Sequence, residues 1–98
     1  MGRAFVVREV VPCAEQDGLV QIEGVLFSVS LDRARDRLGE MGYRVVEMAD
    51  RGALLARRDR GLLILRGDGT FSMSRVDSVE SAISEIANLA ETVASESR

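Results

Sequence analysis

The chain has 98 residues, of which 46% are hydrophobic and 30% charged, and its formal net charge is −3. This length and composition predict one globular domain over residues 1–98 and exclude a disordered chain. All 13 basic residues are arginine, since lysine and histidine are both absent. These absences exclude imidazole general bases, histidine metal ligands, Schiff-base lysines and P-loop lysines, so we expect no enzyme, no cofactor and no metal site.

The formal charge is distributed unevenly along the chain. Residues 33–66 carry nine arginines against five acidic residues, whereas residues 1–32 and 67–98 carry two arginines each, against five and six acidic residues. The cationic middle segment is either a binding surface or the electrostatic partner of the anionic segments within the fold.

The N-terminal segment 1–18 is predicted to be one strand and a connection. A valine-rich run over residues 5–11 predicts the strand, and Pro12 followed by polar residues predicts the connection. Cys13 is the single cysteine, so it cannot form an internal disulfide, and no histidine exists to activate it as a reactive thiol. Because we find neither a secretory signal nor the roughly 18 apolar residues of a membrane span, we expect a cytoplasmic protein without membrane contact.

A second strand and a helix are predicted next. Residues 19–29 predict the strand, and the alternation of its apolar residues changes phase at Gly24, as expected for a β-bulge. From Ser30 the apolar period becomes helical, with one face formed by Leu31, Ala34, Leu38 and Met41. We predict Ser30 as the N-cap and Gly42 as the left-handed residue that ends the helix.

Residues 43–76 alternate short apolar runs with turn residues. Turn aspartates stand nine residues apart, at Asp50, Asp59 and Asp68. Regular turns between apolar runs predict an antiparallel meander. Its four strands are expected at residues 43–49, 53–57, 62–66 and 70–76.

Two of these runs differ in their pattern. In the last run, Phe71 and Met73 alternate with small hydroxylated residues, which predicts a sheet with one buried face. The run 62–65 is apolar at every position, which suits a central strand or one whose second face meets a partner.

A C-terminal helix completes the predicted α+β fold. Asp77 and Glu80 match a capping box. The apolar stripe of the helix comprises Val79, Ala82, Ile83, Ile86, Leu89, Ala90 and Val93. Residues 95–98 are expected to fray. The predicted order is β-β-α-β-β-β-β-α, with an antiparallel sheet and both helices on one face.

Part of the chain resembles a known family. The strand, glycine turn and strand of residues 62–74, followed by Ser78-Val79-Glu80-Ser81-Ala82, are similar to those of the TATA-box-binding-protein family. The element order over about residues 19–94 resembles one repeat of that fold. The family's DNA-binding members use two repeats, apolar wedges and a basic saddle. This chain has one repeat and a negative net charge, so the resemblance implies architecture, and a homodimer would be needed to restore two repeats.

Arginine side chains near the meander are the candidate contacts for an anion or nucleic acid: Arg51, Arg57, Arg58, Arg60 and Arg66. The alternative is that these arginines are solvated or form surface ion pairs. The order of the turns favours it, because Arg57, Arg58 and Arg60 are expected at the opposite end of the strands from Arg51 and Arg66, so the five would not form one surface. Gly67-Asp68-Gly69 is expected to be a hairpin turn rather than a phosphate loop. Asp50 and Asp68 share one end of the meander, where turn formation explains them without a cation.

Two functions remain open from the sequence. The first is a non-enzymatic interaction or assembly module, acting as a homodimer or as a subunit of a larger complex. Its basis is the missing catalytic chemistry together with more apolar strand surface than two helices on one face cover. The second is a nucleic-acid-associated or regulatory protein that uses the arginine-rich segment 33–66.

Overall fold

In the computed structural model, the described residues are 5–12, 20–27, 30–48, 52–59 and 61–95. They form, in chain order, β1 (Phe5–Pro12), β2 (Val20–Leu26), α1 (Leu31–Glu40), β3 (Arg44–Met48), β4 (Ala53–Arg58), β5 (Gly61–Arg66), β6 (Thr70–Val76) and α2 (Val79–Ser95). The α+β class and the predicted order of elements are confirmed. The predictions made for Cys13, Asp50, Arg51, Arg60 and residues 96–98 lie outside the described residues.

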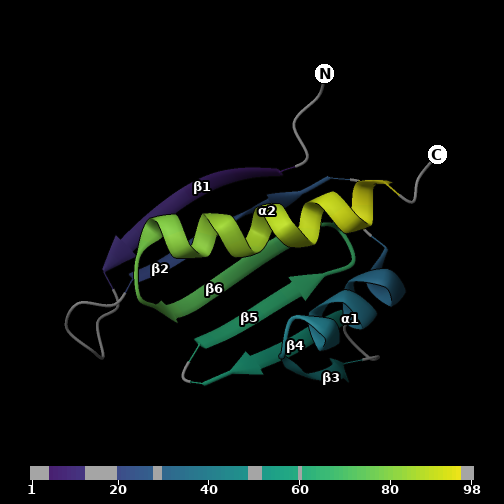
Figure 1. Cartoon of the computed structure of the whole chain (residues 1–98). Helices are drawn as coiled ribbons and strands as arrows, with labels where there is room; N and C mark the ends of the chain where they lie inside the picture. The colour runs from purple at the N-terminus through teal and green to yellow at the C-terminus, as the bar shows by residue number, and fades with distance from the viewer. Residues whose placement is uncertain (1–4, 13–19, 28–29, 49–51, 60, 96–98) are drawn as a thin grey trace.

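The six strands form one antiparallel sheet in the order β1-β2-β6-β5-β4-β3. The meander is confirmed, because β3, β4, β5 and β6 are neighbours in chain order. Figure 1 shows both helices on the same face, where α2 packs on β1, β2 and β6 while α1 packs on β3 and β4. We call the other face, which neither helix covers, the open face.

The hydrophobic core lies between the helices and the covered face of the sheet. Its largest fully buried side chains are Ile22, Leu26, Leu38, Leu63, Leu65, Phe71, Met73, Ile86 and Leu89. The uninterrupted apolar run 62–65 is explained by the place of β5 inside the sheet, with Leu63 and Leu65 under the helices and the alternate residues on the open face.

The caps of α1 follow the sequence prediction, whereas the N-cap of α2 lies one residue later than predicted. The Ser30 hydroxyl accepts a hydrogen bond from the Arg33 amide, and Gly42 has a φ of 95° just beyond the end of α1. At α2 the predicted Asp77 cap is wrong, because the hydroxyl of Ser78 accepts the 3.0 Å hydrogen bond from the Ser81 amide. Serine serves this position as well as aspartate does. Ile83, predicted in the buried stripe, is 37% exposed.

Gly24 is needed for close approach and not for a bulge of its own strand. The register shift lies in the neighbouring strand, between Val7 and Glu9 of β1. A Cβ atom at Gly24 would lie 2.1 Å from the Val6 carbonyl oxygen and 2.8 Å from Cζ of Phe71. The predicted bulge at Gly24 is therefore wrong, and the glycine instead makes room for the β1 backbone and the Phe71 ring. The strand is also shorter than predicted and ends at Leu26.

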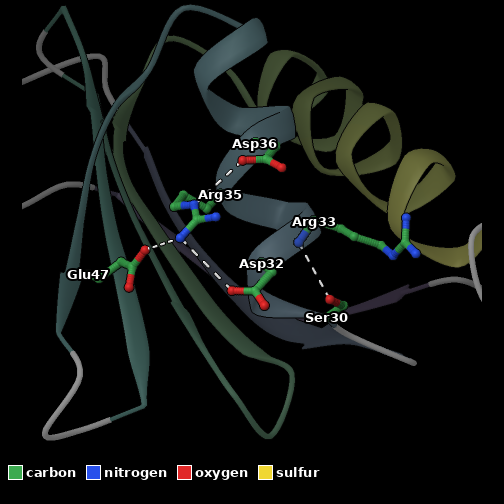
Figure 2. Close-up of polar contacts among 6 residues, drawn as sticks. All are labelled: Ser30, Asp32, Arg33, Arg35, Asp36 and Glu47. Carbon is green, nitrogen blue, oxygen red and sulfur yellow. Dashed lines mark hydrogen bonds and ion pairs between the residues drawn. The ribbon is translucent and has the colours of Figure 1, made fainter.

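Figure 2 shows the polar contacts of Arg35 on α1, together with the cap at Ser30. The Arg35 guanidinium donates to the Glu47 carboxylate on β3, and it lies 3.5 Å from Asp36 and 3.9 Å from Asp32. The hydrogen bond to Glu47 and the surrounding negative charge raise the pKa of Arg35. Because these side chains are largely exposed, the contacts orient α1 over β3 and add little to stability.

The predicted hairpin turn at residues 67–69 is confirmed. The Gly69 amide donates to the Arg66 carbonyl at 2.9 Å, and Gly69 has a φ of 96°. The Asp68 carboxylate accepts hydrogen bonds from both the amide and the hydroxyl of Thr70, which lower the pKa of Asp68. Asp68 thus serves the turn itself.

Candidate functional site

An apolar patch lies on the open face over β3, β4 and β5. We define it as Val46, Leu55, Leu62 and Ile64. Strand register places Val46 opposite Leu55, and Leu55 opposite Ile64, so that these three side chains form one row across the strands. Val46 is 54% exposed, and the other three are half-buried without any helix above them. The surplus apolar strand surface expected from the sequence is therefore on the open face.

The same row continues into polar residues on the other half of the open face. Ile64 lies opposite Ser72, Ser72 opposite Glu23, and Glu23 opposite Glu9. Across the six strands the row thus changes from apolar through hydroxylated to acidic. Arg8 and Arg66 line the same hollow as the two glutamates, so this corner has no large net charge.

Two arginines stand directly opposite each other where β3 begins and β4 ends. Arg44 and Arg57 are Cα partners in the register of these strands, so their side chains emerge on the same face. Both are exposed, and no ion pair joins either one to another residue of the described ranges. Like charges directly opposite on a sheet repel. The pair therefore offers positive charge that no ion pair within the described ranges neutralises.

The structure divides the predicted arginine contacts between different places. Arg57 lies on the open face, whereas the adjacent Arg58 points under α2. Arg66 is at the other end of the strands, opposite Ala53, and donates to the Thr70 hydroxyl. Arg51 and Arg60 lie outside the described residues. Of the predicted set, Arg57 alone belongs to the facing pair.

Arg44 was missing from the sequence prediction. Residues paired between β3 and β4 have numbers that add to 101, as Met48 with Ala53 and Arg44 with Arg57 do. The predicted strands 43–49 and 53–57 would instead pair residues whose numbers add to 102, which sets Arg44 opposite Arg58, so the sequence prediction did not contain this pair.

A polar cluster of Tyr43, Arg58 and Glu85 connects α2 to the sheet. The Tyr43 hydroxyl donates to Oε1 of Glu85 at 2.7 Å, and the Arg58 guanidinium forms an ion pair with the same oxygen at 3.0 Å. Arg58 also donates to the Met41 carbonyl at 2.9 Å and lies 4.7 Å from the centroid of the Tyr43 ring. Burial, followed by the hydrogen bond to Glu85, raises the pKa of Tyr43 above its usual 10.0. The cluster joins three elements that are distant in the sequence.

A pocket of about 470 Å³ adjoins this cluster. Tyr43, Arg58 and Glu85 line it together with residues from the end of β6 and the start of α2, among them Arg75 and Asp77. Its lining carries charges of both signs, and those of Arg58 and Glu85 neutralise each other. The cluster beside this pocket is therefore explained by stability, and the unneutralised Arg44–Arg57 pair offers more to a charged ligand.

The described part of the chain contains neither a metal-ligand cluster nor a membrane-spanning helix. Within those ranges, no group of three cysteine or acidic side chains is placed to hold a metal ion. Neither described helix is both long and apolar enough to cross a membrane.

Comparisons with protein-family models, curated proteins and solved structures found no match. The resemblance of residues 19–94 to a TATA-box-binding-protein repeat therefore stays a prediction. The candidate sites consequently rest on the geometry of the chain.

Proposed function

We propose that this protein is a non-enzymatic interaction module that forms a homodimer through its open face. The observation that carries the proposal is the row of Val46, Leu55 and Ile64 on strands that no helix covers on that side. Contiguous exposed apolar surface of this kind is typical of protein contact sites. The absence of histidine and lysine from the sequence supports a function without catalysis.

A second copy of the chain fits the patch by symmetry. A two-fold axis along the row, perpendicular to the strands, stacks each apolar side chain on its own copy. Because this rotation reverses strand direction, the Arg44–Arg57 pairs of the two copies lie at opposite ends of the interface. Ala53, two residues before Leu55, then faces the aliphatic stem of Arg57, two residues after it. Small side chains thus lie opposite long ones and the arginines lie at the rim, whereas Glu23 and Glu9 of the same row face their own copies and weaken the association.

The size of the face sets the expected affinity. Five interstrand spacings of about 4.8 Å, and strands about 20 Å long, give a footprint of roughly 480 Å² before side-chain relief is counted. Standard interfaces remove about 800 Å² of accessible surface from each partner. The dimer should therefore be at the smaller and weaker end of specific complexes, so that its population depends on concentration.

Sedimentation velocity between about 1 μM and 500 μM tests the proposal, since that range brackets micromolar association. The wild type should shift from monomer to dimer, and Val46→Glu should remain monomeric. The matched control is Val10→Glu, because Val10 is 44% exposed and is paired with Ile22 on the covered face. A wild type that remains monomeric, or equal dissociation by both variants, would refute association through the open face.

A second candidate function is supported by the Arg44–Arg57 pair. Nucleic-acid association through segment 33–66 predicts binding that weakens steeply with salt. Fluorescence anisotropy with a labelled single-stranded oligonucleotide should then show weaker binding for Arg57→Gln. Absence of binding at low salt would remove this candidate.

A further inference from the structure

We propose that Arg44 and Arg57 form a phosphate-binding site at the edge of the sheet, in addition to the association surface proposed above. The site lies where β3 begins and β4 ends, in a hollow of about 350 Å³ lined by Gly42, Arg44, Arg57, Arg58 and Asp59. Strand pairing places the two arginine Cα atoms about 5 Å apart. Their guanidinium groups can therefore reach the same ligand from the same face.

The charge of the pair favours phosphate over a carboxylate. Two guanidinium groups present ten N–H donors and two positive charges. A phosphate monoester carries about −1.5 to −2 charges at neutral pH and has three acceptor oxygens. A carboxylate, with one charge and two oxygens, is satisfied by a single arginine. A phosphate group therefore neutralises both arginines at once and relieves their mutual repulsion.

The Arg58 side chain, which is held in place by its contacts, forms one wall of this hollow. Its guanidinium is held by the Glu85 carboxylate, the Met41 carbonyl and the face of Tyr43. A Cβ atom at Gly42 would lie 3.5 Å from Cδ of Arg58, so the glycine backbone lies against this side chain. The hollow is thus bounded by one ordered arginine, whose guanidinium is turned toward Glu85 on the covered face, and by two exposed arginines on the open face. Because Glu85 offsets the charge of Arg58, the attraction for an anion comes from Arg44 and Arg57.

Asp59 has the opposite effect. This residue also lines the hollow, is exposed, and has a φ of 54° in the turn after β4. Its carboxylate would repel a bound phosphate. We therefore expect Asp59→Asn to tighten binding and removal of either arginine to weaken it.

NMR titration of the ¹⁵N-labelled chain with inorganic phosphate, at constant ionic strength, tests this site. Shifts should saturate and be concentrated at residues 42–44 and 57–59. Arg44→Gln and Arg57→Gln should each weaken binding about tenfold, the value of one charged hydrogen bond. Arg8→Gln is the matched control and should bind as the wild type does, since Arg8 is exposed on the opposite edge strand. Performing every titration in an uncharged Val46→Asn background that sedimentation shows to be monomeric separates phosphate binding from self-association without adding a carboxylate beside Arg44.

Two further titrations identify the ligand class. O-phosphoserine that binds more tightly than inorganic phosphate would identify a phosphate monoester as the ligand, and the reverse order would identify the free ion; both support the site. Succinate that binds as tightly as phosphate would overturn the assignment to phosphate. Shifts that rise linearly without saturation, or an Arg44→Gln/Arg57→Gln double variant that binds like the wild type, would overturn the site itself.

Discussion

Replacing Gly24 and Gly39 by alanine should change stability in opposite directions, although the chemical change is the same. Gly24 lies in β2, where a Cβ atom would be 2.1 Å from the Val6 carbonyl oxygen. Gly39 lies in α1, where a Cβ atom would meet nothing within 4 Å. The pair isolates the effect of close backbone approach from that of chain entropy.

The magnitudes follow from these contacts. A carbon and a carbonyl oxygen normally remain about 3.3 Å apart, so the new methyl group overlaps Val6 by about 1.2 Å. Because the obstacle is backbone, no side-chain rotation relieves it, and the cost should reach about 3 kcal/mol, the upper end for overpacking. Reduced entropy of the unfolded chain returns only about 0.4–1 kcal/mol. At Gly39 that gain is unopposed, and alanine should stabilise the helix by about 0.5–1 kcal/mol.

Thermal and urea unfolding followed by circular dichroism measure both changes. In a domain of this size, 1 kcal/mol corresponds to about 4–8 °C. Gly24→Ala should therefore lower the Tm by about 10–20 °C, whereas Gly39→Ala should raise it by about 2–8 °C. A Gly24→Ala variant as stable as the wild type would refute the close pairing of β1 with β2 and the position of the Phe71 ring.

Four further predictions concern the charged clusters and the dimer. Arg44→Gln should raise the unfolding free energy of the unliganded protein by about 0.2–1 kcal/mol at low salt, because it removes repulsion from Arg57; a gain that persists in high salt would contradict this cause. In a double-mutant cycle, the effects of Tyr43→Phe and Arg58→Met on the unfolding free energy should show a coupling of at least about 0.5 kcal/mol, because both residues contact Glu85 and each other. Additive effects would contradict the cluster. In an ultraviolet titration, the single tyrosine should ionise well above the usual tyrosine pKa of 10.0. Because its pKa is raised in the folded state, the stabilisation it contributes is complete below pH 10 and is lost as the pH rises further. Ionisation near pH 10 in the folded state would contradict the burial of Tyr43. Glu23→Gln should strengthen the proposed dimer, because Glu23 lies in the same row as Leu55 and would face its own copy across the axis; weaker association would disprove this axis.

Much of the fold was accessible from local patterns. Ser30 and Gly42 mark the ends of α1 because capping and left-handed backbone depend on neighbouring residues alone. The turn at Gly69 is local in the same sense. Where two adjacent residues offer the same chemistry, as Asp77 and Ser78 do, the sequence pattern did not decide between them.

The candidate sites depended on register between strands. Arg57 and Arg58 are adjacent in the sequence, yet successive strand residues point to opposite faces, so one is on the open face and the other is held by Glu85. Glu85 was predicted outside the buried stripe of its helix, and nothing local indicated that Tyr43, 42 residues earlier, would donate to it.

The sequence by itself determined the class of protein, the order of its elements and the absence of histidine and lysine chemistry, because these depend on composition and on period along the chain. Only the tertiary structure decided which strands each helix covers, which side chains form the uncovered apolar row, and that Arg44 stands opposite Arg57. The physical reason is that burial and charge repulsion act between side chains brought together by strand pairing, which distance along the chain does not specify.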